Sequence, residues 1–522
     1  MGLLLLFPVV LFFYSIYGVY YRLYLSPIAD IPGPKLAAIT RLYEAYYDLY
    51  LGGKYTFKII ELHKQYGPII RISPWEIHIS DPEFYDTVYA SSASGHRRDK
   101  YDWFTKSFGM DNSVFATHKH DLHRVRRSAL APFFSMASVR RLQPVIQGRL
   151  DLLLERLRGF RDKDEVLMAS WAFAAYTNDI VMEYCFGRCD NRLEAEDFDP
   201  SYRDASFFGS TAGSFMKHAP WVNNLMQALP MWAAASLHPA MASFMAQKRD
   251  NLAQIKDIQA SAASKYQDLD DSDIPTIFHS ILFSKLPPEE KTVTRLSDDA
   301  QVLTMAGTLT TAWVFELVMF WLIRQPTTLS KLKAELTTAI PRLDMIGNIS
   351  LPVLEQLPYL TAVIKEGLRL TYGVSCRLAR IDPDNAMVFT DAATGKEWTI
   401  PPGTPVGLTS VQIHHDERIF PDSKKFSPER WLDGKNRELD KYMVSFTGGS
   451  RQCLGMNLAY AEMYLGLSAI WRQWGSRECR GKDDVGIFDL WETGLGDVEI
   501  ESDAFLPIQQ PGTKGIRVKA FM

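Results

Sequence analysis

The residues with the clearest chemical potential lie in one glycine-rich segment, Phe446–Gly455, with the sequence Phe-Thr-Gly-Gly-Ser-Arg-Gln-Cys-Leu-Gly. Gly448 and Gly449 lack a Cβ, so the backbone can turn sharply and lie flat against a planar group. Arg451 offers a fork of donors suited to a carboxylate. Cys453 comes just before a helical pattern, and a helix N-terminus favours a thiolate over a thiol. A thiolate on such a loop is what an axial ligand to haem iron requires.

The common alternative for this cysteine is a buried free thiol beside a turn, since unpaired cysteines are usually core residues. The spacing Phe-x-x-Gly-x-Arg-x-Cys-x-Gly argues against that alternative, because five positions in ten are fixed. The segment resembles the haem-binding signature of the cytochrome P-450 family, the haem-thiolate monooxygenases. The resemblance implies that Cys453 binds the iron of haem b and that Phe446 and Arg451 contact the cofactor.

A long apolar helix is expected over residues 297–324, ahead of a proline. Its centre, residues 306–311 (Ala-Gly-Thr-Leu-Thr-Thr), resembles the family's oxygen-binding groove. The resemblance makes Ala306 and Gly307 cofactor-contacting residues. It makes Thr310 the catalytic residue, whose hydroxyl serves dioxygen chemistry.

One position of this groove departs from the family's pattern. An acid usually precedes the threonine and helps to relay protons, but Leu309 stands there in this chain. Glu316 is six residues beyond Thr310, which is about 600° of helical turn, so it is expected to face elsewhere. The sequence therefore leaves the source of protons open.

Two further segments offer partners for the carboxylates of the cofactor. His123 and Arg127 lie four residues apart on a basic helix and share one face, although a solvated basic face would look the same. The family holds a haem propionate with a Trp-x-x-x-Arg pair here, and histidine in place of tryptophan can still donate to a carboxylate. Arg380, at the end of an expected strand edge over residues 372–380, aligns with a propionate ligand of the family.

A third group resembles the family's structural network beneath the haem. Glu366 and Arg369 meet on one face of a helix, and a surface ion pair is the alternative reading. By resemblance, they lock onto Arg430 of the Phe-Ser-Pro-Glu-Arg-Trp segment, in a structural role. The adjacent residues His414-His415-Asp416 suggest a metal site, but neighbouring side chains point apart, so a structural role is preferred.

Composition and charge exclude other classes of protein. Hydrophobic residues make up 47% of the 522 residues, which is enough for a large core. The net charge of −4 gives no basic footprint, so no nucleic-acid partner is expected. The five cysteines are sparse and odd in number, which favours a reducing compartment over a disulfide framework. Cys185 and Cys189 have the spacing of half a zinc site, but no second pair of ligands lies nearby.

The N-terminal segment predicts a membrane anchor. Residues 2–21 contain no charged side chain, and about twenty apolar residues span a bilayer core of roughly 30 Å. A cleaved signal peptide, the alternative, would carry a basic leader and a small-residue cleavage site. We therefore predict a retained anchor over residues 1–22. Its first charge, Arg22, follows the apolar run, which places the rest of the chain in the cytosol.

The chain beyond the anchor divides into a hinge and one catalytic domain. Ile31-Pro-Gly-Pro34 stiffens the chain, so residues 23–36 are predicted to form a proline-containing hinge. Residues 37–522 are predicted to form the catalytic domain. By resemblance, the fold is mainly α with small β-sheets: the cytochrome P-450 fold, a triangular helical body around a buried haem, with an N-terminal transmembrane helix.

Other segments predict the surroundings of the site. Residues 65–82 alternate and predict a strand hairpin, and residues 486–522 predict a closing β hairpin. The segment 206–245 is consistent with a membrane-dipping lid or with a helical core. Residues 268–273 predict a solvated acidic loop. The candidate substrate contacts are apolar and consist of Phe104, Phe115, Met305, Leu309, Val374 and Phe505.

The resemblance implies a monooxygenase that hydroxylates or epoxidises an apolar small molecule, and we expect a terpenoid or polyketide intermediate of fungal secondary metabolism. Electrons from NADPH would arrive through a cytochrome P-450 reductase carrying FAD and FMN, with cytochrome b5 as a second potential donor. We expect a monomer in the endoplasmic reticulum membrane. Two alternatives stay open: a reductase-independent enzyme that rearranges peroxides, which Leu309 alone favours, and a non-catalytic haem sensor.

Overall fold

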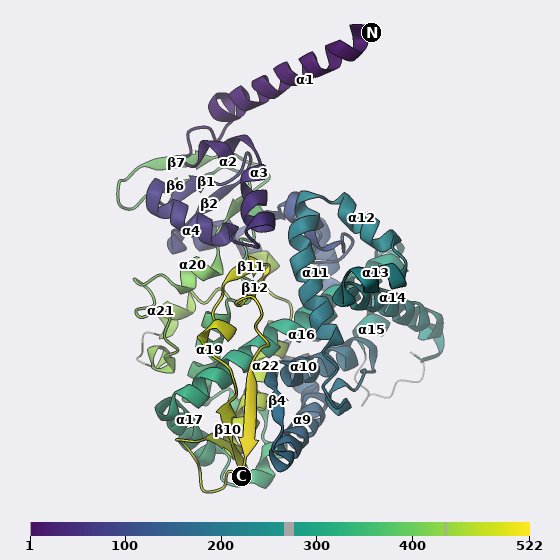
Figure 1. Ribbon diagram of the computed structural model, residues 1–522, viewed down its shortest axis with the longest axis vertical. Helices are drawn as coiled ribbons and strands as arrows, with labels where there is room; N and C mark the ends of the chain where they lie inside the picture. The colour runs from purple at the N-terminus through teal and green to yellow at the C-terminus, as the bar shows by residue number, and fades with distance from the viewer. Residues whose placement is uncertain (1, 266–275, 433, 435) are drawn as a thin grey trace.

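The computed structural model describes residues 2–265, 276–432, 434 and 436–522 (Figure 1). Helices dominate the described chain and the strands form small sheets, which agrees with the predicted mainly α fold. Helix α1 (Gly2–Tyr20) projects from the body, and the C-terminus lies at the opposite end (Figure 1). The predicted acidic loop at residues 268–273 lies outside the described residues.

The helical body is built from ten further long helices. They are α4 (Tyr55–Tyr66), α7 (His120–Leu130), α9 (Gln143–Lys163), α10 (Ala169–Phe186), α11 (Ser201–His218), α14 (Pro239–Lys265), α16 (Val293–Arg324), α17 (Pro326–Ala339), α19 (Pro358–Thr371) and α22 (Met456–Gln473). Local sequence explains where several of these helices begin or end. Gly187, with φ of 72°, closes α10, and prolines occupy the first turns of α17 and α19.

The strands form two sheets and two hairpins. The five-stranded sheet has the order β1 (Ile69–Arg71), β2 (Ile77–Ile79), β8 (Val406–Gly407), β5 (Arg380–Ile381) and β3 (Asp99–Lys100). The four-stranded sheet has the order β4 (Val166–Met168), β13 (Arg517–Phe521), β10 (Gly486–Leu490) and β9 (Trp474–Ser476). The separate hairpins are β6 (Met387–Thr390) with β7 (Glu397–Ile400), and β11 (Ser502–Ala504) with β12 (Leu506–Ile508).

These strands confirm one prediction and correct two. The hairpin predicted within residues 65–82 is β1–β2, with Ile69 opposite Ile79. The expected strand edge over residues 372–380 is a strand at its last residue only. Residues 486–522 form two units rather than one hairpin, because β10 pairs with β13 while β11 and β12 turn back on each other.

Helix α16 is the central element of the body, as Figure 1 shows. It begins four residues before the predicted start, where the Thr292 side chain accepts a bond from the Arg295 N–H, and ends before Pro326. Within the described residues it is the one helix long and apolar enough to cross a membrane, but 67% of its apolar window is buried. It is therefore a core helix. The predicted N-terminal span stays a prediction.

The segment 206–245 is helical, and part of it forms the core that its composition predicts, whereas the membrane-dipping lid stays a prediction. It spans most of α11, then α12 (Trp221–Ala228), α13 (Met231–Leu237) and the start of α14. Met216, Met226 and Ala234 form a small core with residues of α14. Trp221 and Trp232 point outward and are 65% and 74% exposed.

Candidate active site

A cavity of about 300 Å³ lies between α16, the cysteine segment, α22 and the β11–β12 hairpin. All nine residues predicted to form the site line it: His123, Arg127, Ala306, Gly307, Thr310, Arg380, Phe446, Arg451 and Cys453. These residues come from four separate stretches of the sequence. The fold therefore brings the whole predicted set to one place.

The cysteine segment is a tight turn held by its own backbone and by a neighbouring loop. The Cys453 N–H donates to the Phe446 carbonyl at 2.9 Å. Gly449 has φ of 73°, and a Cβ there would lie 2.1 Å from the Tyr89 carbonyl oxygen. The positive φ of Gly449 gives the sharp turn that the sequence predicts, and close backbone packing on residues 89–90 leaves no room for a Cβ at this position.

The Cys453 thiol faces the cavity at the start of α22. Burial raises the pKa of this thiol, whereas the backbone N–H groups of Gly455 and Met456 and the charge of Arg127 lower it. The N-terminus of α22 lowers the pKa of the thiol, as expected, but desolvation raises this pKa by more. A metal cation bound at Cys453 would supply the missing stabilisation, since a thiol that coordinates a metal is deprotonated.

A cluster of buried cations surrounds one edge of the cavity. Lys100, Arg380 and Arg451 are each less than a tenth exposed, and Arg127 lies beside them. Burial and the neighbouring Arg380 lower the pKa of Arg451 to about 9. Burial, followed by the charge of Arg451, lowers the pKa of His123 below its usual range, so this imidazole is neutral.

These cations lack acidic partners in the part of the chain that the structure describes. Lys100 donates to the Phe115 carbonyl and Arg380 to the Leu378 carbonyl, at 2.5 and 2.7 Å. The buried Nε of Arg451 has no hydrogen-bond partner among the described residues. Buried cations normally need an anion. Together with a cavity-facing thiol and apolar walls, this donor set fits haem b, a flat apolar group with two carboxylates.

The opposite wall is the centre of α16. The Thr310 hydroxyl donates to the Ala306 carbonyl at 2.8 Å, one turn back, and its side chain borders the cavity. A Cβ on Gly307 would lie 2.9 Å from Val181 on α10, so this glycine allows close packing of two helices while its backbone borders the cavity. Glu316 faces elsewhere, as predicted, and accepts a hydrogen bond from Ser170.

Aromatic side chains close the substrate side. Phe505, at the tip of β11–β12, has ring centroids 6.3, 4.9 and 5.7 Å from those of Phe104, Phe108 and Phe115. Five of the six predicted substrate contacts line the cavity: Phe115, Met305, Leu309, Val374 and Phe505. Phe104 does not, because it lies behind Phe505 and lines a smaller adjoining cavity of about 30 Å³.

The Glu366 network is buried, unlike a surface ion pair. Arg369 donates to Glu366 from Nε at 2.9 Å and from the second guanidinium nitrogen at 2.8 Å, and both side chains are 0% exposed. Arg430 and Trp431 also donate to Glu366, at 3.1 and 2.9 Å. The network therefore ties α19 to the segment that carries Arg430.

The histidines of the 414–416 segment have protein partners on both ring nitrogens. His414 contacts the Arg369 carbonyl at 2.8 Å and the Val444 N–H at 3.1 Å. His415 contacts Ser423 and Tyr372, at 3.0 and 2.7 Å. These contacts favour the structural reading of this segment.

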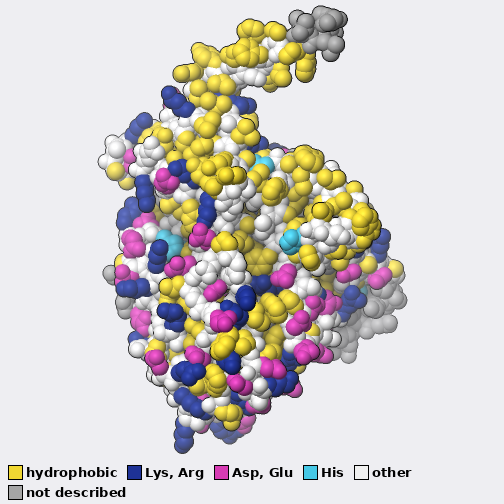
Figure 2. All heavy atoms as spheres, in the orientation of Figure 1, with side chains coloured by type: hydrophobic (Ala, Val, Ile, Leu, Met, Phe, Trp, Pro, Cys, Tyr) yellow, Lys and Arg dark blue, Asp and Glu magenta, His cyan; other side chains and the backbone are white. Residues whose placement is uncertain are grey.

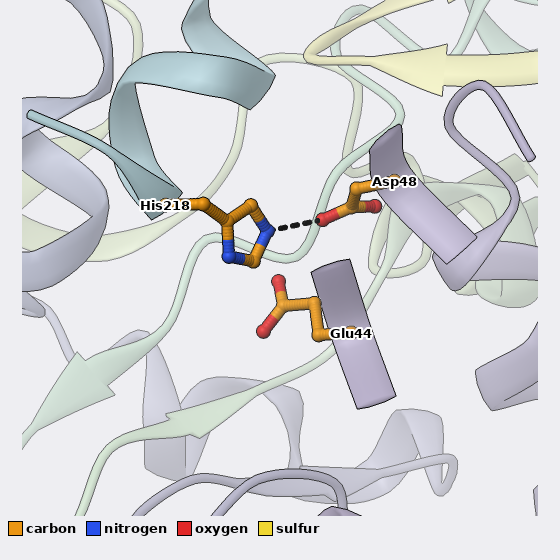
Figure 3. Close-up of side chains that lie close together, drawn as sticks. All are labelled: Glu44, Asp48 and His218. Carbon is orange, nitrogen blue, oxygen red and sulfur yellow. Dashed lines mark hydrogen bonds and ion pairs between the residues drawn. The ribbon is translucent and has the colours of Figure 1, made fainter. Parts of the chain in front are cut away.

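A different trio, Glu44, Asp48 and His218, has the spacing of metal ligands (Figure 3). The Lys217 ammonium lies 2.9 Å from Glu44 and 2.5 Å from Asp48. Arg377 is a second cation beside Glu44, at 2.7 Å. Two cations therefore already balance these carboxylates, and the trio belongs to a buried ion network between the N-terminal helices and α11.

Two charged residues of the cavity were not found from the sequence. Lys100 lies in an aromatic segment without a recognisable spacing, and only its pairing through β3 with β5 places it beside Arg380. Glu462 lies in the helical pattern after Cys453 and resembles an ordinary surface acid. The sequence signal for Glu462 was its place on the apolar face of that helix. The structure agrees with this signal, since Glu462 is 2% exposed.

Comparison with known proteins agrees with this geometry. The family model for cytochrome P450 matches residues 45–498. Cytochrome P450 monooxygenase tpcC of Cochliobolus heterostrophus is 50% identical, over 97% of this chain and 95% of its own. Cytochrome P450 monooxygenase astB of Talaromyces wortmannii is 44% identical, over 97% and 95%. Tryptophan 6-hydroxylase fscE of Fusarium equiseti is 38% identical, over 95% and 93%.

The match covers most of the chain and nearly the full length of each relative. Members of this family bind haem iron through a cysteine thiolate and receive electrons from a redox partner. They oxidise small molecules with dioxygen. The chain belongs to the cytochrome P450 family and is a monooxygenase.

Proposed function

We propose that this chain is a membrane-attached monooxygenase that uses NADPH-derived electrons to oxidise an apolar small molecule of fungal secondary metabolism. The observation that carries this proposal is the cavity itself. It joins a cavity-facing thiol, a threonine hydroxyl on the facing helix and a largely apolar wall.

When bound, haem supplies an iron centre that reduces dioxygen and transfers one of its oxygen atoms to the substrate. The residues of this chain then have separate roles. Cys453 would hold the iron through its sulfur. Lys100, Arg127, Arg380 and Arg451 would hold the propionates, with His123 as a neutral donor. Thr310 presents a hydroxyl that donates and accepts protons on the oxygen side.

The lining of the cavity suggests the substrate class. The wall near Thr310 carries Met305, Leu309 and Val314, and the aromatic cluster around Phe505 excludes water from the far side. Hydroxyl groups on α11, Ser206 and Ser210, are already bonded to carbonyl groups. A terpenoid or polyketide intermediate would suit this surface, and hydroxylation or epoxidation would be the reaction.

A basic surface beside the cysteine segment supports an acidic redox partner, which we identify as an NADPH-cytochrome P450 reductase, with cytochrome b5 as a second donor. Arg451 donates to the His118 carbonyl at 2.7 Å, so the start of α7 lies against the cysteine segment. Lys119, the residue before α7, and Arg124 on α7 are exposed, as are Arg140 and Arg141 beyond the helix. Such a patch attracts an acidic partner and speeds its association.

Exposed apolar side chains support attachment to the endoplasmic reticulum membrane through residues 1–22, with the hinge at 23–36. Figure 2 shows them over α1 and over the region of α12 and α13. The more exposed ones are Phe7, Phe13, Tyr14, Leu42, Tyr50, Trp221, Trp232 and Leu237. Contiguous exposed apolar surface of this kind marks contact with a membrane or a partner. We expect a monomer with residues 37–522 on the cytosolic side.

Expression in a host that supplies a reductase tests the function. Metabolite profiles with and without the chain should differ by an oxygenated product, and ¹⁸O₂ should label it. Cys453→Ala, the matched control, should give no product. A product that forms without NADPH or reductase would instead favour the peroxide-rearranging alternative.

Attachment is tested separately by fractionation. The full chain should sediment with microsomes and resist extraction by carbonate, whereas a chain without residues 1–22 should be partly released. Protease added to intact microsomes should degrade the catalytic domain. Complete release of the full chain by carbonate would refute the predicted anchor.

A further inference from the structure

Two cavities with opposite chemistry adjoin each other on the substrate side of the molecule. The active-site cavity is the larger one, of about 300 Å³. The smaller one, of about 30 Å³, belongs to the buried ion network and is here called the charged cavity. Its charged lining residues are Asp48, Glu76, Lys217, Arg377 and Asp503. Phe108, Ser210 and Phe505 line both cavities, so these three residues form a partition between them.

The partition is closely packed. The ring centroids of Phe108 and Phe505 are 4.9 Å apart and their planes meet at 66°, which is a favourable edge-to-face contact. The Ser210 hydroxyl donates to the Ala504 carbonyl and ties α11 to the β11–β12 hairpin at the same place. A Cβ on Gly213 would lie 3.3 Å from the Phe108 ring, so α11 lies directly against this ring.

On the active-site side, the partition continues into a wall that offers a substrate no free donor. This substrate wall consists of the cavity-lining residues of segment 108–115, of α11, of α16 before Thr310 and of the β11–β12 tip. Ser206 and Ser210 are its polar side chains among the described residues, and they are 0% and 4% exposed. Both hydroxyls already donate to backbone carbonyls, those of Tyr202 and Ala504.

On the other side, the charged cavity is rich in donors and acceptors. The Lys217 ammonium lies 2.5 Å from Asp48, and the Arg377 Nε lies 2.7 Å from Glu76. An ammonium has three donors and each carboxylate oxygen accepts more than one hydrogen bond, so such pairs can also bind a hydroxyl group. A polar group would therefore find partners behind the partition that the substrate wall lacks.

This contrast determines which substrates the active-site cavity favours. A hydroxyl or carbonyl group that leaves water for an apolar wall loses hydrogen bonds that are not replaced. A hydrocarbon has no such bonds to lose. An apolar pocket rejects an added hydroxyl group by up to about 100-fold. The cavity should thus select against substrates that already carry oxygen.

We propose that the substrate is an unoxygenated hydrocarbon skeleton, and that Phe108 and Phe505 enforce this choice by separating it from the charged cavity. This inference rests on the proposed monooxygenase function. One turnover consumes the hydrocarbon, dioxygen, two electrons from the reductase and two protons. When it hydroxylates, a C–H bond breaks, a C–O bond forms, and the products are an alcohol and one water.

The substrate class also fixes a place in a reaction sequence. Cyclisation of a polyprenyl diphosphate expels the diphosphate, and loss of a proton then releases a cyclic hydrocarbon. Assembly from acyl units, in contrast, ordinarily leaves oxygen on the carbon chain. The terpenoid alternative is therefore favoured over the polyketide. This chain acts directly after a skeleton-forming cyclisation and makes the first C–O bond.

The first test measures the binding of matched probes to the haem-loaded full chain. The probes are cedrane and its alcohol cedrol, and adamantane and its alcohol adamantanol. Each is titrated while the shift of the haem absorbance band is followed. Each hydrocarbon should bind about 10- to 100-fold more tightly than its alcohol. Equal or tighter binding of the alcohols, or no binding of either hydrocarbon, would overturn the inference.

Variants of the partition test its role. Phe505→Ala and Phe108→Ala each open a way to the charged cavity, so the preference for hydrocarbon over alcohol should fall at least about fivefold. The matched control is Phe104→Ala. The Phe104 ring packs 5.9 and 6.3 Å from Phe108 and Phe505 but lines only the charged cavity of the two, so its loss should leave the preference unchanged. A wild-type preference in both opened variants would show that the partition does not set it.

The second test identifies the oxygen content of the natural substrate. Deleting the gene from its native host should cause the substrate to accumulate in the cells, the medium or the headspace. High-resolution mass spectrometry should then show a compound of carbon and hydrogen alone. The same compound, supplied to the chain with reductase and NADPH, should gain one oxygen atom. An accumulated precursor that already contains oxygen would refute the inference.

The outcomes separate the two proposals. A wild-type chain that forms no oxygenated product in any host with a reductase defeats the proposed function, while the probe titrations still report the preference of the cavity. A wild-type chain that oxidises an oxygen-containing precursor defeats the hydrocarbon inference alone. The reduced, CO-bound spectrum of each variant verifies that the haem site is intact.

Discussion

Replacing Glu366 by glutamine removes the charge at the centre of the buried network while keeping the shape of the side chain. Glu366 accepts five hydrogen bonds: two from Arg369, and one each from Arg430, Trp431 and the Ser427 N–H. Every partner is a donor, so the amide nitrogen of glutamine would face donors. Arg369 would remain buried without a counter-charge.

The magnitude follows from the partners that Arg369 retains. Removing one member of a buried ion pair costs about 3–5 kcal/mol. Arg369 keeps three carbonyl acceptors, on His414, Ser423 and Lys425. These contacts satisfy part of the hydrogen-bonding capacity of Arg369. We therefore expect Glu366→Gln to lower the free energy of unfolding by an amount near the lower limit, about 3 kcal/mol.

Urea titration of the haem-loaded chain, followed by circular dichroism, measures the loss. The control is Glu61→Gln, which breaks another helical pair at the same i, i+3 spacing. The Lys58–Glu61 pair is 2.9 Å long, but its side chains are 21% and 68% exposed. Glu61→Gln should lower the free energy of unfolding by less than about 0.5 kcal/mol, since water screens an exposed pair. Equal losses in the two variants would refute the reasoning that burial sets the cost.

Three further outcomes follow from the structure. Cys453→Ala should abolish the thiolate band of the reduced, CO-bound spectrum, and a variant that keeps this band would show that Cys453 is not the ligand. Gly449→Ala should lower the haem-to-protein ratio severalfold, because its Cβ has no room at φ of 73°; a normal ratio would contradict the packing described. Burial raises the pKa of Glu44, but Arg377 and Lys217 outweigh it and hold the pKa well below its usual range. Because the folded pKa is lowered, this carboxylate stabilises the fold at neutral pH and loses its effect only in strong acid. Lys217→Met should therefore move acid unfolding, followed by tryptophan fluorescence, to higher pH, and an unchanged midpoint would contradict this.

Residues whose role depends on a short spacing could be predicted from the sequence. Cys453 and Arg451 share one turn, and Ala306 and Thr310 are one helical turn apart, so local geometry fixes their relation. The fold class followed from the same local patterns, since helical periods dominate the chain. The long apolar helix was likewise identifiable, although its start required the capping residue Thr292.

Residues placed by distant parts of the chain could not be predicted. Lys100 joins the cation cluster only because β3 pairs with β5. Glu462 becomes a cavity acid only because α22 packs on α16. The reason for Gly449 is also non-local, since the backbone it must clear belongs to residues 89–90. These relations depend on pairings far apart in sequence, which no local pattern encodes.

The hairpin β11–β12 has a consequence for the order in which the protein matures. Thr56 donates to Asp503, and Lys54 pairs with Glu501, across 447 positions of the chain. Because this hairpin carries Phe505, the substrate wall is incomplete until nearly the last residues leave the ribosome. Contacts of such long range form late and slowly. A nascent chain therefore exposes its cofactor chamber throughout synthesis, and final closure belongs to the released polypeptide.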